Sequence, residues 1–389
     1  MEEKLVRLTS DLVAIESVNP GYPSGKRGEV EIAAFVEDYC RRLGLDVQRQ
    51  SVHPERDNVL AHLTVPNAQK TVLFEAHMDT VALDSMGERA LSPEVRDGRL
   101  YGRGSCDTKG SLAAMLAALE SLIAQRDQLA VNVALLTTVD EELQFSGIRA
   151  FVESGERVEA AVVGEPTDLQ VVVAHKGCLR VRVSTLGRAA HSARPEVGVN
   201  AIDHMADVLQ AFRGLQERLP GREHALVGSP TLSVGIIAGG TGVNVVPDRC
   251  TIDIDRRTIP GEDMESALAE IDALLAEVRR TKPEIQLERE GPSADDWALD
   301  TPVDAAVVLA AQAACRSLGR PDMLLGVPYS TDASKLWALR EVPSIVLGPG
   351  SITQAHTADE YVPVEHLSAA VQIYERTALN LSERLSARN

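Results

Sequence analysis

Apolar side chains recur every three or four residues over residues 5–15, 32–43 and 112–123. This spacing places them on one face of a helix, so three helices are expected in the first third of the chain. Residues 59–65 and 71–76, which lie between the second and third helices, are rich in aliphatic and β-branched side chains. Such runs are typical of strands, and the chain therefore begins with helices and then strands.

Three further runs, at residues 131–139, 160–163 and 343–347, are short and almost continuously apolar. Strands with this pattern are buried on both faces, as in a mostly parallel sheet covered by helices on each side. The pattern therefore predicts an α/β core.

The order of elements changes between residues 177 and 290. The pattern predicts strands at 179–186, 231–237, 245–254 and 285–289, with helices at 199–219 and 262–278. A β-α-β-β-α-β unit of this kind is a compact α+β domain. Because a helix (303–318) and a buried strand (343–347) follow it, we predict a domain of residues 177–290 inserted into a core built from residues 1–176 and 291–389, with hinges near 176–177 and 291–292.

Charge and composition limit the classes of partner and the compartment that we expect for this protein. The formal net charge is −18, which disfavours binding to phosphate backbones or anionic lipid, so neither nucleic acid nor a membrane is expected as a partner. The N-terminus is acidic and no apolar stretch approaches the ~18 residues that span a bilayer, which favours a cytoplasmic protein. Five scattered cysteines without a C-x-x-C pair are expected to be free thiols.

Metal-ligand side chains follow the predicted strands of the core. The set comprises His77, Asp79, Glu141, Glu142, Glu165 and His356, together with Asp107 from the turn before the third helix. Considered alone, Asp107 would be interpreted as an ordinary helix cap, and the Glu141-Glu142 pair would be interpreted as a solvated turn. Because ligands bind beyond the carboxyl ends of parallel strands, the coincidence of several such clusters at one edge favours a site instead.

Two histidines and several carboxylates, with no thiolate, form the ligand set of a hydrolytic two-metal site whose ions lie roughly 3.5–4 Å apart. Zinc is the first expectation, with Co²⁺ or Mn²⁺ as possible substitutes. Such a site needs a base that is not itself a ligand. Glu141 and Glu142 can supply a base and a ligand, because successive side chains near a strand end diverge.

Five segments resemble, in order and spacing, the motifs of the di-zinc amidohydrolase and peptidase family that includes acetylornithine deacetylase, succinyl-diaminopimelate desuccinylase and glutamate carboxypeptidase. They are FEAHMDT at 74–80, YGRGSCDTKG at 101–110, DEE at 140–142, GEPT at 164–167 and AHTADE at 355–360. The resemblance covers nearly the whole chain.

The resemblance implies a role for each residue of the set. One zinc would be bound by His77, Asp107 and Glu165, and the other by Asp107, Glu142 and His356. Asp107 would then bridge the two ions, Glu141 would be the general base, and Asp79 would orient His77.

The resemblance extends to the inserted domain. His191, in GRAAHSARP at 187–195, resembles a histidine that reaches a neighbouring subunit's active site, which implies a homodimer. Asn244 and Arg257 resemble groups that bind the substrate carboxylate, for which the planar guanidinium is suited. Arg256 is adjacent, and the sequence leaves the choice between the two arginines open.

The expected activity is metal-dependent hydrolysis of the amide bond of an N-acyl amino acid or a small peptide with a free carboxylate. An aminopeptidase or dipeptidase using the same site is the competing interpretation. A non-catalytic binding protein is disfavoured, because Glu141 and every expected ligand are present.

Overall fold

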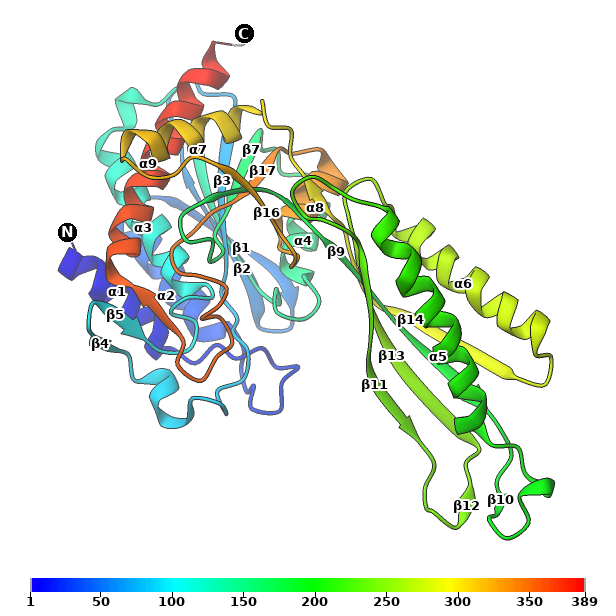
Figure 1. The fold of residues 1–389 in the computed structure, drawn as a ribbon. Coiled ribbons are helices and arrows are strands. Elements are labelled where there is room, and N and C mark those ends of the chain that lie inside the picture. Colours follow the sequence, from blue (N-terminus) through cyan, green and yellow to red (C-terminus); the bar gives the residue numbers. More distant parts are fainter. Residues whose placement is uncertain (1, 388–389) are drawn as a thin grey trace. The chain divides into compact units, whose positions relative to one another are not determined.

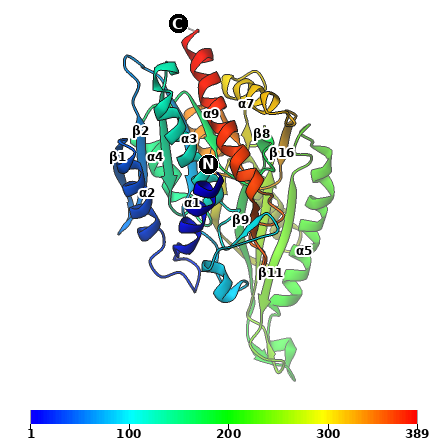
Figure 2. The same cartoon turned by 90° about the vertical axis from the view of Figure 1, so that its left-hand side faces the viewer.

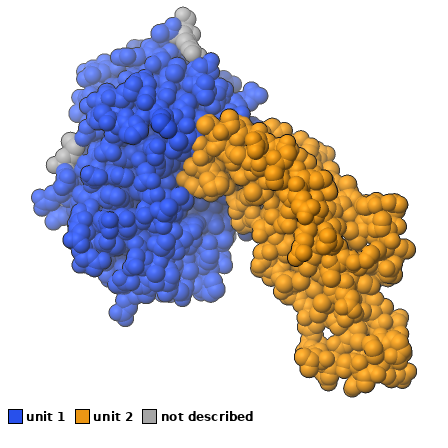
Figure 3. All heavy atoms as spheres, in the orientation of Figure 1, with its two compact units in different colours: residues 1–173, 300–325, 331–389 blue, residues 174–299, 326–330 orange. Residues whose placement is uncertain are grey.

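The computed structural model describes residues 2–387, which form two compact units (Figures 1 and 3). Unit 1 comprises Met1–Val173, Asp300–Leu325 and Thr331–Asn389, and unit 2 comprises Ala174–Leu299 and Gly326–Ser330. Each unit has a hydrophobic core of its own.

Within the described residues, a nine-stranded sheet, most of which belongs to unit 1, has the order β1-β2-β6-β3-β7-β17-β8-β15, with β16 paired to β8. The strands are β1 (Asp46–His53), β2 (Arg56–Leu63), β3 (Thr71–His77), β6 (Asn132–Thr138), β7 (Ala160–Val163), β8 (Val171–His175), β15 (Leu299–Asp300), β16 (Leu324–Val327) and β17 (Ser344–Val346). The four central strands, β6, β3, β7 and β17, are parallel. Antiparallel pairs flank them, so the sheet is parallel where the apolar runs predicted it and mixed at its sides.

Helices cover both faces of this sheet. The helices are α1 (Glu2–Ala14), α2 (Val30–Arg42), α3 (Lys109–Ala124), α4 (Ser146–Ser154), α7 (Ala306–Ser317), α8 (Ala333–Arg340) and α9 (Val364–Ser386). Helices α1 and α9 lie toward the viewer in Figure 2. Buried residues of α1, α2, α3, α7 and α9 share one core with Val72, Phe74 and Ala76, which alternate along β3. On the other side, α4 and α8 contact each other and strands β1, β7 and β17. A small sheet of β4 (Glu94–Arg96), β5 (Arg99–Tyr101) and β18 (Tyr361–Pro363) completes the unit.

Unit 2 has the predicted β-α-β-β-α-β order. Its elements are β9 (Gly177–Leu186), α5 (Ala201–Arg218), β11 (Thr231–Gly239), β13 (Arg249–Thr258), α6 (Met264–Thr281) and β14 (Gln286–Asp296), and the sheet order is β11-β13-β9-β14. The strand predicted at 245–254 is wrong as a single element. Pro247 has no N–H to donate, and the chain divides there into β13 and a short β12 (Val245–Val246) that pairs with β10 (Ala190–His191).

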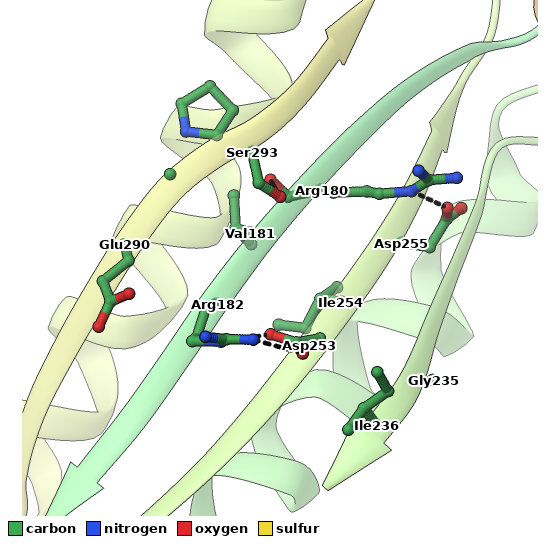
Figure 4. A pocket seen from close by; sticks show the side chains of 12 residues that line it. Arg180, Val181, Arg182, Gly235, Ile236, Asp253, Ile254, Asp255, Glu290 and Ser293 are labelled. Atoms are coloured by element: carbon green, nitrogen blue, oxygen red, sulfur yellow. Dashed lines mark hydrogen bonds and ion pairs between the residues drawn. The ribbon is translucent and has the colours of Figure 1, made fainter. Parts of the chain in front are cut away.

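Alternating burial along β13 separates its side chains into two sets. Ile252, Ile254 and Arg256 are buried on one face, in contact with the helices, whereas Asp253 and Asp255 lie on the open face. On that open face Arg182 binds Asp253 at 2.7 Å and Arg180 binds Asp255 at 3.0 Å, across neighbouring strands (Figure 4). Opposite charges at facing positions stabilise the antiparallel pair.

The hinge expected at 291–292 lies inside a strand instead. β14 pairs with β9 on both sides of this position, through Glu290 with Arg182 and Ala294 with Arg180, around a bulge. Unit 2 continues to Leu299. Among residues 2–387, no helix is long and apolar enough to cross a bilayer.

Candidate metal centre

The carboxyl ends of the four parallel strands bring the expected ligands to one edge of the unit 1 sheet. His77 is the last residue of β3, Glu141 and Glu142 lie in the turn after β6, and Glu165 follows β7. His356 comes from the loop after β17. This is the edge at which open α/β sheets bind ligands.

Asp107, in the turn before α3, lies between the two histidines. Its Oδ1 is 3.0 Å from His77 Nε2 and its Oδ2 is 3.2 Å from His356 Nε2. Glu165 Oε1 is 3.7 Å from His77 Nε2, and Glu142 Oε1 is 3.1 Å from His356 Nε2. Two groups of three ligand-type side chains therefore share one carboxylate, whose two oxygens face different imidazoles.

Glu141 lies close to the same groups. One ligand-type atom from each of His77, Glu141 and Glu165 falls within a 4.8 Å cluster. Of the two adjacent glutamates, however, it is Glu142 that makes the 3.1 Å contact with His356. The two glutamates therefore differ in their contacts: Glu142 lies beside His356, and Glu141 lies with His77 and Glu165.

The centre brings several carboxylates together, of which Asp107 and Glu165 are buried. Burial and neighbouring acids raise the pKa of Glu141 and Glu165 well above the usual range. Burial also opposes ionisation of Asp107, but hydrogen bonds from His356 and His77 hold its pKa below the usual value. Hydrogen bonds to Asp107 and Glu142 in turn raise the pKa of His356 to about 11.

These residues fit divalent metal ions. Ligand atoms of His77, Glu141 and Glu165, and of His77, Asp107 and Glu142, lie within 4.8 Å of one another. His356 Nε2 lies beside Asp107 and Glu142, and a cation would offset the mutual repulsion of the acids. Nitrogen and oxygen donors without a thiolate suit zinc, and also cobalt or manganese.

Asp79 contacts both His77 and the glutamate pair. Its carbonyl oxygen is 3.0 Å from His77 Nδ1, and its carboxylate Oδ1 is 3.5 Å from the same nitrogen. The carboxylate also accepts hydrogen bonds from the backbone N–H groups of Glu141, at 3.0 Å, and Glu142, at 3.1 Å. Asp79 thus links the orientation of the histidine to the position of the turn.

Glu360 is a structural partner of the centre that the sequence reasoning missed. Its Oε1 accepts the backbone N–H groups of Cys106, at 3.1 Å, and Asp107, at 3.2 Å, and its Oε2 lies 2.5 Å from Arg103. All of these groups are buried. Glu360 ends the AHTADE segment, but no signal in the sequence shows a partner 253 positions away.

The remaining expected site residues lie in unit 2. His191 is exposed on β10, and the backbone of Asn244 is next to it, since the N–H of Ser192 donates to the carbonyl of Asn244 at 3.0 Å. Arg257 is at the opposite end of β13, is 26% exposed, and binds Asp255 at 2.7 Å.

Arg256, the alternative to Arg257, is fully buried and bound to Glu262 at 3.1 Å. The choice that the sequence left open therefore favours Arg257 as the arginine that a substrate can reach.

Comparisons with known proteins identify the fold and the family. Residues 73–380 match the profile of peptidase family M20/M25/M40. The aminopeptidase PepT of Bacillus cereus ATCC 10987 is similar with a TM-score of 0.79 and 22% identity, over 98% of this chain and 99% of that one. An M20 family metallo-carboxypeptidase from Sulfolobus solfataricus gives a TM-score of 0.80 and 19% identity, over 98% and 99%.

The YXEP protein of Bacillus subtilis, described as a dinuclear metal binding peptidase, gives a TM-score of 0.74 and 16% identity, over 98% of both chains. Identities this low show a shared fold. The matched segment 73–380 spans most of the chain and contains every expected ligand, and the resemblance inferred from the motifs is thereby confirmed. The chain belongs to peptidase family M20/M25/M40 and is a metal-dependent peptidase or amidohydrolase.

Proposed function

We propose that the protein hydrolyses the amide bond of an N-acyl amino acid or a small peptide with a free carboxylate, using two zinc ions. The observation that carries the proposal is the position of Asp107, whose two oxygens each face a different histidine. Cobalt or manganese could occupy the same nitrogen and oxygen donors.

In this proposal His77, Asp107 and Glu165 would hold one ion, and Asp107, Glu142 and His356 would hold the other. When bound, the ions would polarise the scissile carbonyl and favour ionisation of a water molecule. Asp79 keeps His77 and the glutamate turn in place, through the contacts at its carbonyl and carboxylate.

Glu141 is the proposed general base. Its raised pKa suits a carboxylate that first takes a proton from the attacking water and then returns it to the leaving amine. Because the adjacent Glu142 contacts His356, Glu141 need not serve as a ligand.

Unit 2 supplies the proposed groups for the oxyanion and the substrate carboxylate. Arg257 and Arg249 lie at opposite ends of β13, eight residues apart, which is roughly 26 Å of extended strand. His191 and Asn244 lie beyond the Arg249 end, so one chain cannot bring them and Arg257 to the same small substrate without unfolding this sheet. The separation supports a homodimer in which His191 and Asn244 of one copy complete the site of the other, whose own Arg257 binds substrate.

The substrate class is tested with zinc-loaded protein and a panel of N-acetyl amino acids, N-succinyl amino acids and dipeptides. Cleavage of the acylated compounds, abolished in Glu141→Gln, is the expected result. Cleavage confined to peptides with a free amine would instead establish the aminopeptidase or dipeptidase alternative. No cleavage of any compound by protein with full metal content would contradict the proposal and favour a binding protein.

A further inference from the structure

Asn19 lies in the segment between α1 and α2, far in sequence from every expected ligand. Its backbone docks beside the end of β3: Val18 and Thr80 form a parallel bridge, and the N–H of Asn19 donates to the carbonyl of Thr80 at 3.0 Å. The side chain is almost fully buried, with the residue 1% exposed. The segment therefore carries this amide into the interior of unit 1.

The amide nitrogen of Asn19 joins two carboxylates. Nδ2 lies 2.8 Å from Asp79 Oδ2 and 2.8 Å from Asp140 Oδ1. The amide oxygen accepts the N–H of Gly21 at 3.0 Å, which fixes the orientation of the amide. All the hydrogens of this side-chain nitrogen thus have an acceptor.

The two carboxylates hold opposite sides of the glutamate turn. Asp79 accepts the N–H groups of Glu141 and Glu142. The backbone N–H of Asp140 is held by buried Glu29 at 3.0 Å, and the Asp140 side chain accepts the hydroxyl of Ser146 beyond the turn. Asn19 is the direct side-chain link between these two sets of contacts.

An amide is the chemically suitable group at this position. Two buried carboxylates that approach the same nitrogen repel each other, and two N–H donors on one atom satisfy both without adding charge. A carboxylate there would remove both donors and place a third negative charge beside Asp79 and Asp140. A hydroxyl would offer one donor in place of two.

We propose that Asn19 is a positioning residue of the metal centre: by tying Asp79 to Asp140, it fixes the turn that carries Glu141 and Glu142 and, through Asp79, the imidazole of His77. The kinetic consequence rests on the proposed hydrolysis. The consequence for zinc binding does not, because it follows from the placement of the ligands alone.

The test compares Asn19→Asp and Asn19→Ser with a matched control, Asn58→Asp. Asn58 is also fully buried and donates two hydrogen bonds, to Gln50 and to the carbonyl of Gly147, both at 2.8 Å. The side-chain oxygen of Asn58 accepts the N–H of Val139 at 3.1 Å, and an aspartate oxygen would still accept it. None of these partners is the side chain of Asp79 or Asp140. The measurements are zinc affinity by competition with a chelator, kcat and KM separately, and thermal unfolding of the zinc-free protein.

Asn19→Asp is expected to lower zinc affinity and kcat by about 10- to 100-fold each, as loss of a partner behind a metal ligand does, with KM little changed. The zinc affinity and kcat of Asn19→Ser should lie between those of Asn19→Asp and the parent. If Asn19→Asp does not fold, Asn19→Ser tests the proposal in its place. Asn58→Asp should lower the unfolding temperature without a comparable loss of zinc affinity or kcat.

Two results would overturn the proposal. One is parental zinc affinity in folded Asn19→Asp, or in Asn19→Ser if Asn19→Asp does not fold. The other is an equal loss of zinc affinity in Asn58→Asp at a similar loss of stability. That result would show that replacing any buried side-chain amide lowers zinc affinity. If the parent hydrolyses no substrate, the proposed function fails, and the zinc measurements still decide the role of Asn19.

Discussion

Asp107 belongs to both proposed zinc sites. Its Oδ1 lies 3.0 Å from His77 Nε2, and its Oδ2 lies 3.2 Å from His356 Nε2. A bridging carboxylate serves both ions and offsets their mutual repulsion. Asp107→Ala is therefore expected to lose both zinc equivalents, measured by elemental analysis after dialysis. The matched variant Glu165→Ala should lose mainly one equivalent. Loss of a single equivalent from Asp107→Ala would refute the bridge.

Replacing each of the adjacent glutamates with glutamine should distinguish their roles. Glu141→Gln removes the proton acceptor and keeps the ligands, so we expect near-normal zinc content and a loss of kcat of about 10²-fold to 10⁴-fold. Glu142→Gln weakens the group beside His356 and should lower zinc affinity instead. The reverse pattern, with zinc lost from Glu141→Gln, would show that the two roles are exchanged.

The raised pKa values of His77 and His356 predict that zinc binding depends on pH. Without metal, hydrogen bonds to Asp107 and Glu142 raise the pKa of His356 to about 11, and neighbouring acids raise that of His77 despite its burial. The His356 imidazole is then protonated at neutral pH, whereas a metal ligand must be neutral. Zinc must displace this proton, so zinc affinity should rise with pH, and about one proton or more per chain should be released on loading near neutral pH. Calorimetry in buffers of different ionisation enthalpy measures this release, and none at all would contradict the assignment.

Residues whose chemistry is evident from their own type and position can be predicted from the sequence. His77, Glu142, Glu165 and His356 follow predicted strands, and the parallel sheet brings them together. Asn19 and Glu360 could not be found in this way. An asparagine between two helices and an acid at the end of a loop are ordinary residues until tertiary packing reveals their partners.

At the scale of elements, the pattern of apolar residues predicted the central strands. These strands are buried on both faces, so their sequences are continuously apolar, as in β7. No helix was predicted at α9, whose 23 residues form the longest helix within residues 2–387, although its apolar residues recur every three or four positions from Leu367 to Leu385. The same pattern predicted β12 and β13 as one strand, because apolar side chains occur on either side of Pro247. Local pattern identifies an apolar face but not the partner that covers it.

Gly164 sets how closely β7 approaches α3, immediately before Glu165. A Cβ at this position would lie 2.8 Å from Ser111 Cβ and 2.9 Å from Met115 Cε. Gly164→Ala is therefore expected to destabilise the protein by about 1–3 kcal/mol and to weaken zinc binding by displacing Glu165. Gly221→Ala is the control, since a Cβ there meets nothing within 4 Å. Thermal unfolding and zinc titration test this, and equal behaviour of the two variants would contradict the packing argument.

For the whole molecule, the sequence predicted two domains from the interruption of the α/β pattern, and the structure forms two units with separate cores. The boundary was less predictable. The Gly291-Pro292 pair resembles a loop in sequence, but β14 accommodates it as a bulge and continues its pairing with β9. Backbone pairing over a long strand outweighs the local preference of two residues.

The homodimer is the prediction that depends on the whole molecule. His191 and Asn244 lie beyond one end of β13 and Arg257 near the other, so a complete site would draw on two copies of unit 2. Exposed Ile236 and Ile237 on the edge strand β11 offer an apolar surface and unpaired backbone that a second copy could cover. We expect His191→Ala and Glu141→Gln proteins, each nearly inactive, to recover part of the parental activity when they are refolded together. A heterodimer would contain one site with both groups intact, whereas mixing without refolding serves as the control. A fully active monomer by light scattering, or heterodimers that form and stay inactive, would rule out a shared site.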